Sequence, residues 1–238
     1  MKKDLKTILI TKQIYAFVKQ YTQMEINGKK VHCPYWMNKI TAERKIIRGF
    51  QDGKGKAEDI KNEIAKLLVQ TNKVTPPQLL IRKLSKSKRI GIDCSGFVYR
   101  VLEELVRLKY QGTNLNSLED LFTGGVTRTN ADRLTSYEFS VPIKKVAQIR
   151  LGDMIRLQKG RHIALILEVK KKEIIYCHAS QQSTKIKGAH LSKIIIKNVN
   201  DSIDKQVWPE KASSGDNYGQ KYLNTKEGDG IFRLKIFT

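Results

Sequence analysis

Apolar residues in the first half of the chain recur with helical spacing, and polar connections separate them. This pattern predicts helices over 9–23, over 56–71 and from about Ser95 to Lys109. The three apolar stripes are Ile10, Ile14, Phe17, Val18 and Tyr21; Ile60, Ile64, Leu67 and Leu68; and Phe97, Val98, Val101, Leu102, Leu105 and Leu108. Pro34 favours a non-helical segment at "VHCPYWMN". The stretch "TPPQLLIRKLSKSKR", residues 75–89, is interpreted as a proline-marked connection with a basic tail.

The pattern changes after Gly124 and Gly125 to short runs rich in β-branched residues. "LGDMIRL" is typical of a turn that enters a strand, and "HIALILEV", "EIIYCHA", "HLSKIIIKN" and "GIFRLKIF" predict strands. The segment "SSGDNYGQ", 213–220, is expected to be a surface loop. Because helices come early and strands late, the predicted fold class is α+β, with helices packed on one face of an antiparallel sheet.

Composition changes this picture mainly through charge. The 238 residues carry 45 Lys and Arg against 23 Asp and Glu, a formal net charge of +22. Such a surface attracts nucleic acid, anionic wall polymers or acidic lipid head groups. The lysines are spread along the chain, so compositional bias explains the charge equally well. Both interpretations stay open.

Cysteine usage and hydropathy exclude several classes. Three cysteines, at 33, 94 and 177, do not form a disulfide framework, and without a CxxC pair a structural zinc site is not expected. No metal or cofactor is predicted. No apolar run approaches the ~20 residues of a membrane span, and the N-terminal segment lacks the apolar region of a secretory signal. We therefore expect a cytoplasmic protein, or one released by lysis or non-classical export.

Candidate chemistry centres on "GIDCSGFVYRVLEE", 91–104, which places Cys94 at the first turn of a predicted helix. The positive end of a helix lowers a thiol pKa, and the free N–H groups there can bind an oxyanion. Asp93 can cap this helix, and Gly96 leaves the first turn open. The alternative is that Cys94 is simply a small buried apolar residue.

A nucleophilic cysteine needs a base, and the spacing of two histidines suggests one. His162 and His178 flank one predicted hairpin. An odd-length turn centred on Lys170 would place His162 opposite His178 on one face of the sheet, with Ile163, Leu165, Leu167 and Val169 on the opposite, buried side. One imidazole could then act as base and the other could orient it. A hairpin with an even loop would put the two rings on opposite faces. Cys177 should point to the core, Cys33 is expected to be a packed thiol, and His190 is given no role.

These residues resemble a known family. "DCSGFVYRVL" looks like the nucleophile segment of NlpC/P60 peptidases, papain-like cysteine hydrolases of bacterial cell-wall peptides. "LGDMIRL", "RHIALILEV" and "IIYCHAS" follow in that family's order, "CPYWMN" is similar to its Pro-Tyr-x-Trp segment, and "TRTNADRL" resembles its Arg-Thr loop. The resemblance implies a single papain-like NlpC/P60 catalytic domain over 1–238, with helices on an antiparallel sheet or partly open barrel.

The resemblance also implies roles for individual residues. Cys94 corresponds to the nucleophile, His162 to the base and His178 to the polar residue that orients it. Tyr35 corresponds to a tyrosine near the substrate, and Asp93 and Ser95 to substrate-binding positions; Asp93 matches an acidic residue that can meet a free amine. The family's usual gap between the Tyr and Cys positions is short, so 39–90 is interpreted as an inserted helical segment that forms a lid or rim over the cleft.

The expected function is a cysteine hydrolase that cleaves an amide bond in peptidoglycan peptides. Among such enzymes, the first expectation is a γ-D-glutamyl–diamino-acid endopeptidase. The substrate would be a peptidoglycan peptide or muropeptide, and the basic surface could contact an anionic polymer. An alternative is a papain-like amidase, deamidase or acyltransferase acting on a protein or lipid. A third interpretation is a non-catalytic module that binds polyanions.

Overall fold

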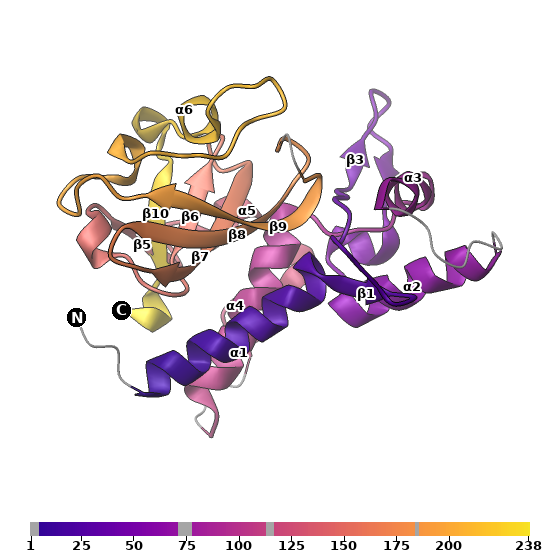
Figure 1. Cartoon of the computed structure of the whole chain (residues 1–238), viewed down its shortest axis with the longest axis horizontal. Coiled ribbons are helices and arrows are strands. Elements are labelled where there is room, and N and C mark those ends of the chain that lie inside the picture. The colour runs from indigo at the N-terminus through magenta and orange to yellow at the C-terminus, as the bar shows by residue number, and fades with distance from the viewer. Residues whose placement is uncertain (1–4, 71–77, 113–116, 184–185) are drawn as a thin grey trace.

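A six-stranded antiparallel sheet forms one half of the molecule, and two long helices lie against it (Figure 1). The computed structural model describes residues 5–70, 78–112, 117–183 and 186–238. Over these residues the fold is mixed α+β with antiparallel sheets, which confirms the predicted fold class. Within the described ranges, no helix is both long and apolar enough to cross a membrane.

The strands of the main sheet come almost entirely from the second half of the chain. Their order is β5-β10-β6-β7-β8-β9, with β5 and β9 at the two ends, so the described part of the sheet is open rather than a closed barrel. The strands are β5 Ser140–Ile143, β6 Met154–Leu157, β7 His162–Val169, β8 Glu173–Ser180, β9 Gly188–Ile195 and β10 Gly230–Leu234. Strands β7 and β8 are neighbours in this order; β7 begins at His162, and His178 lies near the end of β8.

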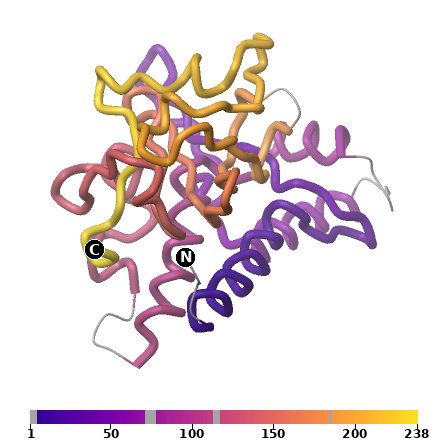
Figure 2. The backbone as a smooth tube through the Cα atoms, turned by 60° about the vertical axis from the view of Figure 1, so that its left-hand side comes forward, coloured from indigo at the N-terminus to yellow at the C-terminus, as the bar shows by residue number. Residues whose placement is uncertain are grey.

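The helices come mostly from the first half. Helix α1, Leu5–Thr22, packs along α4, Cys94–Tyr110, and α4 packs against β7 and β8. The backbone view in Figure 2 shows the same arrangement from another side. The remaining elements are β1 Met24–Ile26 and β2 Lys29–Val31, β3 Lys39–Ile40 and β4 Ile46–Ile47, α2 Ala57–Gln70, α3 Gln78–Lys88, α5 Ala131–Leu134 and α6 Tyr218–Tyr222.

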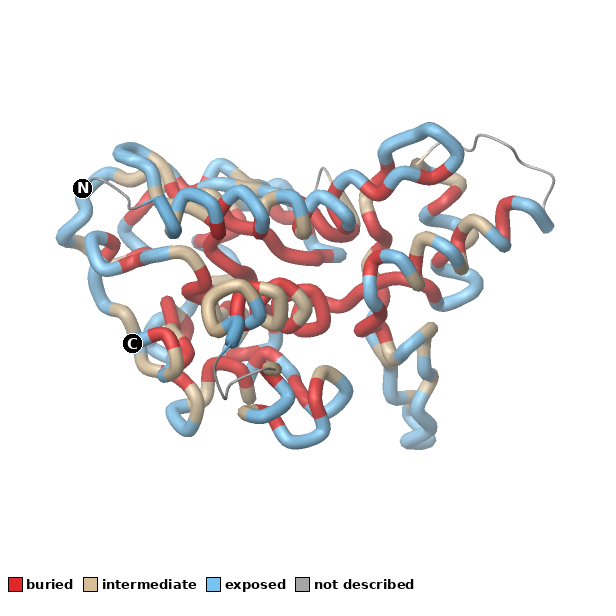
Figure 3. The backbone as a smooth tube through the Cα atoms, turned by 90° about the horizontal axis from the view of Figure 1, so that it is seen from below, coloured by how far each residue is buried: buried red, intermediate tan, exposed pale blue. Residues whose placement is uncertain are grey.

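Apolar side chains fill both faces of the sheet. One core lies between α1, α4 and the sheet and contains Ile163, Leu165 and Leu167. The second core, on the opposite face, contains Ala164 and Ile166 and is closed by Trp208 and Tyr218 from the segment after β9. The central backbone is accordingly buried over long stretches (Figure 3). The helices do cover one face, as expected, but coil and the short α6 bury the other.

Two predicted connections contain helices. The stretch predicted as a connection, 75–89, forms α3 over Gln78–Lys88, and residues 75–77 lie outside the described part. Helix α3 turns Ile81 into the core, an apolar contact that the prolines and basic residues concealed. The predicted surface loop 213–220 runs into α6, where Tyr218 is fully buried.

The hairpin between β7 and β8 does not have the predicted register. Lys170 N–H donates to Glu173 O at 2.8 Å, so the turn is even rather than odd, and Val169 faces Ile174. A bulge between Ile166 and Glu168 then shifts the register by one residue, so that Leu165 faces Cys177. An even turn alone would separate the two histidines, but the bulge restores them to one face. They lie diagonally rather than directly opposite each other, and the bulge places Val169 against the second core.

The inserted segment 39–90 is anchored to the start of α4. Asp93 N–H donates to Gly53 O at 2.7 Å, and Lys54 pairs with Ile92 as an isolated bridge. A Cβ added at Gly96 would lie 2.9 Å from Gly53 O, so only glycine permits this approach. The insertion therefore forms one wall beside the helix that begins with Cys94.

Candidate active site

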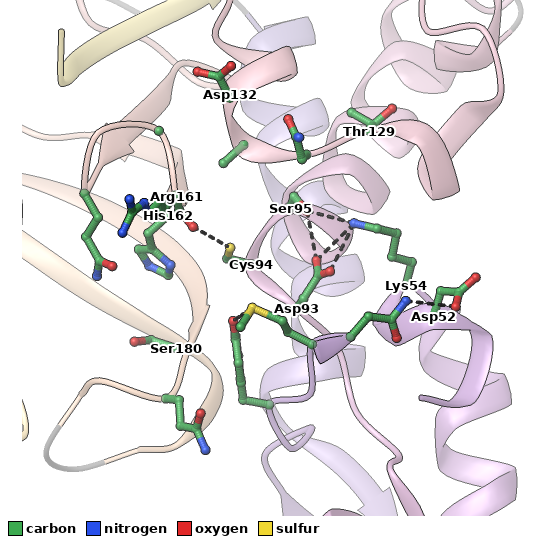
Figure 4. A pocket seen from close by; sticks show the side chains of 18 of the residues that line it. Asp52, Lys54, Asp93, Cys94, Ser95, Thr129, Asp132, Arg161, His162 and Ser180 are labelled. Carbon is green, nitrogen blue, oxygen red and sulfur yellow. Dashed lines mark hydrogen bonds and ion pairs between the residues drawn. The ribbon is translucent and has the colours of Figure 1, made fainter. Parts of the chain in front are cut away.

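Five of the six predicted site residues line one open cavity of about 880 Å³. The lining comes from six segments far apart in sequence, at 35–38, 52–54, 93–95, 127–132, 158–162 and 180–182. Cys94 and His162 are both in the wall, and Figure 4 shows their side chains near each other at one end of the cavity. His178 is not in the wall: it is fully buried behind His162.

Cys94 is the first residue of α4, as the sequence predicts. Asp93 caps the helix by accepting the Gly96 N–H at 2.5 Å. The N–H groups of Cys94 and Ser95 belong to the first turn and have no acceptor within the helix. These two groups can therefore stabilise negative charge that develops on a bound carbonyl oxygen.

The Cys94 sulfur lies against the backbone at the start of β7. Its Sγ is 3.9 Å from Arg161 O, the residue before His162, and the Ile163 N–H favours its thiolate form. Burial nevertheless raises the pKa of Cys94 to about 12, and the Asp93 carboxylate acts in the same direction. The lowered thiol pKa expected from the helix terminus is therefore not found in the resting site, where burial outweighs it.

The two histidines that the hairpin brings together are hydrogen-bonded. His162 Nε2 lies 2.9 Å from His178 Nδ1, and the ring centroids are 5.2 Å apart. Because Nε2 of His162 is engaged in this way, Nδ1 is the ring nitrogen left for the thiol. Burial lowers the pKa of His162 well below its usual value, and the neighbouring His178 lowers it further. The resting site thus contains a neutral thiol beside a neutral imidazole.

Behind His178 lie two residues that sequence reasoning did not assign to the site. Glu210 Oε1 is 3.2 Å from His178 Nε2, and His190 Nε2 is 3.0 Å from the same nitrogen. The second Glu210 oxygen accepts the Tyr176 hydroxyl at 2.5 Å. Burial acts to raise the pKa of Glu210, but His178 and His190 outweigh it and hold that pKa well below its usual range. Glu210 is therefore a buried carboxylate that can only accept hydrogen bonds.

This carboxylate determines which ring nitrogens carry protons. Since Glu210 can only accept, His178 donates from Nε2, and its Nδ1 accepts from His162 Nε2–H. The lone pair of His162 is then on Nδ1, the nitrogen available to Cys94. The chain from Glu210 through His178 to His162 thus selects the tautomer that a general base requires.

Asp93 and Ser95 are already bound within the protein. Lys54, from the inserted segment, places Nζ 3.1 Å from an Asp93 oxygen and 2.8 Å from Ser95 Oγ (Figure 4). The Lys54 and Asp93 side chains are only 10% and 12% exposed. No sequence motif pointed to Lys54, which lies in the insertion. Its ammonium neutralises the Asp93 carboxylate, the group that the family resemblance assigns to binding a substrate amine.

Tyr35 reaches the cavity because its segment runs beside the chain that leads into α4. Ile92 N–H donates to Pro34 O at 2.9 Å, and Tyr35 pairs with Ile92 as an isolated bridge. The Tyr35 hydroxyl lies 3.4 Å from Met37 Sδ. Burial raises the pKa of Tyr35, so the hydroxyl is a neutral group that can donate a hydrogen bond at the cavity wall. Cys33 and Cys177 are fully buried in the first core, as predicted.

Comparisons with protein-family models, with curated proteins and with solved structures found no match to this chain. The resemblance to NlpC/P60 peptidases therefore rests on the motifs quoted above. The functional proposal below is therefore based on the geometry of the cavity.

The raised pKa of Cys94 predicts how this thiol reacts. Only the thiolate is alkylated, so the rate of Cys94 modification by iodoacetamide should rise by about tenfold for each pH unit above neutrality. Mass spectrometry of the modified peptide measures the rate. The Cys94→Ala variant is the control for the two other cysteines. A rate already at its plateau near neutral pH would instead reveal a preformed thiolate–imidazolium pair.

The Lys54–Asp93 pair predicts a stability difference. Lys54→Met leaves a buried carboxylate without its cation and should lower the free energy of unfolding by about 3 kcal/mol. Arg48→Met is the matched control, because Arg48 pairs with Asp52 at 2.9 Å but is 62% exposed. That variant should stay within about 1 kcal/mol of the unmodified protein. Urea unfolding measures the free energy of unfolding of both variants. Equal decreases would show that the buried Lys54–Asp93 pair contributes no more to stability than the exposed Arg48–Asp52 pair.

Proposed function

We propose that the protein is a cysteine hydrolase that cleaves an amide bond by thiolate attack from Cys94. The observation that supports this most directly is the position of Cys94 at a helix N-terminus, in an open cavity that it shares with His162, whose second ring nitrogen is bonded to His178. A nucleophile, a base and a residue that orients the base are the three parts that acyl transfer needs.

The proposed reaction begins with proton transfer. His162 Nδ1 takes the thiol proton as Cys94 Sγ attacks the carbonyl carbon, and the imidazolium that forms is stabilised through His178 by the Glu210 carboxylate. The first-turn N–H groups of α4 hold the oxyanion, with the Tyr35 hydroxyl as a further donor. His162 then protonates the leaving amine, which leaves a thioester. Water, deprotonated by His162, hydrolyses the thioester and restores the thiol.

The substrate class follows from the resemblance. We propose a peptidoglycan peptide or muropeptide, cleaved at a γ-D-glutamyl–diamino-acid bond. A second candidate keeps the chemistry and changes the acyl donor to a protein or lipid. The Lys54–Asp93 pair favours this second candidate, because Asp93 is not free to bind the amine of a wall peptide unless Lys54 is displaced.

Removing the nucleophile tests the chemistry. Cys94→Ala should abolish hydrolysis of purified muropeptides of known linkage, whereas His178→Ala should retain a fraction of it, because His178 orients rather than reacts. The products are identified by mass, with iodoacetamide-treated enzyme as a second control. If Cys94→Ala hydrolyses the muropeptides as fast as the unmodified protein, the proposal fails. If neither protein cleaves them, protein and lipid acyl donors are assayed in the same way.

Glu210 should act through His178. Glu210→Gln keeps a hydrogen-bond acceptor but loses the charge that stabilises the imidazolium. It should therefore lower kcat by about 10- to 100-fold, less than the ~10⁴-fold cost of a wrong tautomer in the Ser-His-Asp triad, and leave KM unchanged. Glu173→Gln is the control, because Glu173 lies at the start of β8 and pairs with the exposed Lys170 and Lys193. A change in KM with kcat preserved would assign Glu210 to substrate binding instead.

A further inference from the structure

Three ligand atoms converge behind the proposed catalytic base. They are Nε2 of His178, Nε2 of His190 and Oε1 of Glu210, and all three lie within 4.8 Å of one another. The edges of this triangle are 3.0 Å between the two nitrogens, 3.2 Å from His178 to Glu210 and 3.2 Å from His190 to Glu210. The side chains of His178, His190 and Glu210 are 0%, 4% and 6% exposed.

The protons available do not satisfy this triangle fully. His190 Nδ1 lies 2.9 Å from Gly188 O, a carbonyl that can only accept, so Nδ1 carries a proton. In the neutral His190 ring, Nε2 is then a lone-pair acceptor that faces the Glu210 carboxylate, another acceptor. A single Nε2–H from His178 serves both of them. Two acceptors held 3.2 Å apart in a buried place are well suited to a shared cation.

We propose that His178, His190 and Glu210 form a binding site for a divalent transition metal, best met by Zn²⁺, and that its occupation switches the proposed hydrolase off. Zinc binds imidazole nitrogen and carboxylate oxygen at about 2.0–2.2 Å in tetrahedral geometry, which spaces the ligand atoms about 3.3 Å apart. The observed triangle needs to open by only a few tenths of an ångström. Water would be the fourth ligand.

The groups around the triangle support this assignment. Metal-binding histidines usually donate their other ring N–H to a carbonyl or carboxylate, and His190 does so to Gly188 O. Glu210 uses its second oxygen to accept from Tyr176, whose hydroxyl keeps its proton because burial raises its pKa. Metal binding would leave the hydrogen bonds of His190 to Gly188 O and of Tyr176 to Glu210 in place. It would only reverse the direction of the hydrogen bond between His162 and His178.

Inhibition follows from the tautomers. A neutral imidazole bound to metal through Nε2 carries its proton on Nδ1, so His178 would donate to His162 Nε2 instead of accepting from it. The proton on His162 Nε2 passes to His178 Nδ1, the displaced His178 Nε2 proton leaves to solvent, and His162 takes a proton at Nδ1. The nitrogen left for Cys94, Nδ1, then has no lone pair with which to accept the thiol proton. This second step rests on the proposed function, whereas metal binding does not.

Metal binding is tested first, without any activity assay. The unmodified protein and Cys94→Ala should each bind one Zn²⁺, and His190→Gln should bind it more weakly by more than the roughly 10- to 100-fold that loss of a second-shell partner costs. Competition with a chromophoric chelator measures the affinity. Co²⁺ bound to the unmodified protein should give tetrahedral d–d bands without a thiolate charge-transfer band. A thiolate band, loss of binding in Cys94→Ala, or no binding at all would overturn the site.

Inhibition is tested on the unmodified protein. One equivalent of Zn²⁺ should lower turnover at least about 100-fold, and EDTA should restore it. A wrong histidine tautomer lowers kcat by up to about 10⁴-fold in the Ser-His-Asp triad, so a decrease of this size is expected. His190→Gln should be insensitive to the same Zn²⁺ concentration relative to its own metal-free rate. Zinc bound at full occupancy with turnover unchanged would overturn the switch but leave the site. Absence of hydrolysis in metal-free protein would count against the proposed function alone.

Discussion

The hydrogen bond between His162 and His178 is the contact on which the candidate site depends. It joins two imidazoles, with Nε2 of His162 and Nδ1 of His178 only 2.9 Å apart, and it leaves Nδ1 as the nitrogen of His162 available to Cys94. The bond exists because an even turn and a bulge in β7 combine to bring both side chains to one face. Moving either strand by one residue would send one ring into the other core.

Burying so many polar groups is costly unless each finds a partner. Here the cost is offset by a connected set that runs from His162 through His178 and Glu210 to Tyr176. Coil and a short helix cover this face of the sheet, and Tyr218 ties the covering segment to Glu210 through a backbone hydrogen bond of 2.9 Å. The segment that seals the second core is thus also the one that supplies the carboxylate.

Sequence reasoning predicted α1, α2, α4 and the strands β6 to β10, but not α3, β5 or the hydrogen bonds that join the site residues. The helical stripe after Cys94 predicted α4, and the apolar run rich in β-branched residues after His162 predicted β7. The register was wrong, since no residue type announces a bulge at Leu167. Glu210 and Lys54 were missed for a different reason: each lies in irregular chain, where periodicity carries no information, and only tertiary packing brings it to the site. Helix α3 was missed because Pro76 and Pro77 precede it and basic residues interrupt its apolar positions.

The inserted segment contributes charged side chains to the cavity as well as part of its wall. Each acidic side chain in the wall already has a cation of the protein as its partner: Asp52 has Arg48, Asp93 has Lys54 and Asp132 has Arg156. Lys54 also opposes the effect of Asp93 on the Cys94 thiol, because a nearby ammonium favours the thiolate that a carboxylate disfavours. In the proposed reaction, a substrate group that displaced Lys54 from Asp93 would therefore alter the electrostatic field at the Cys94 sulfur.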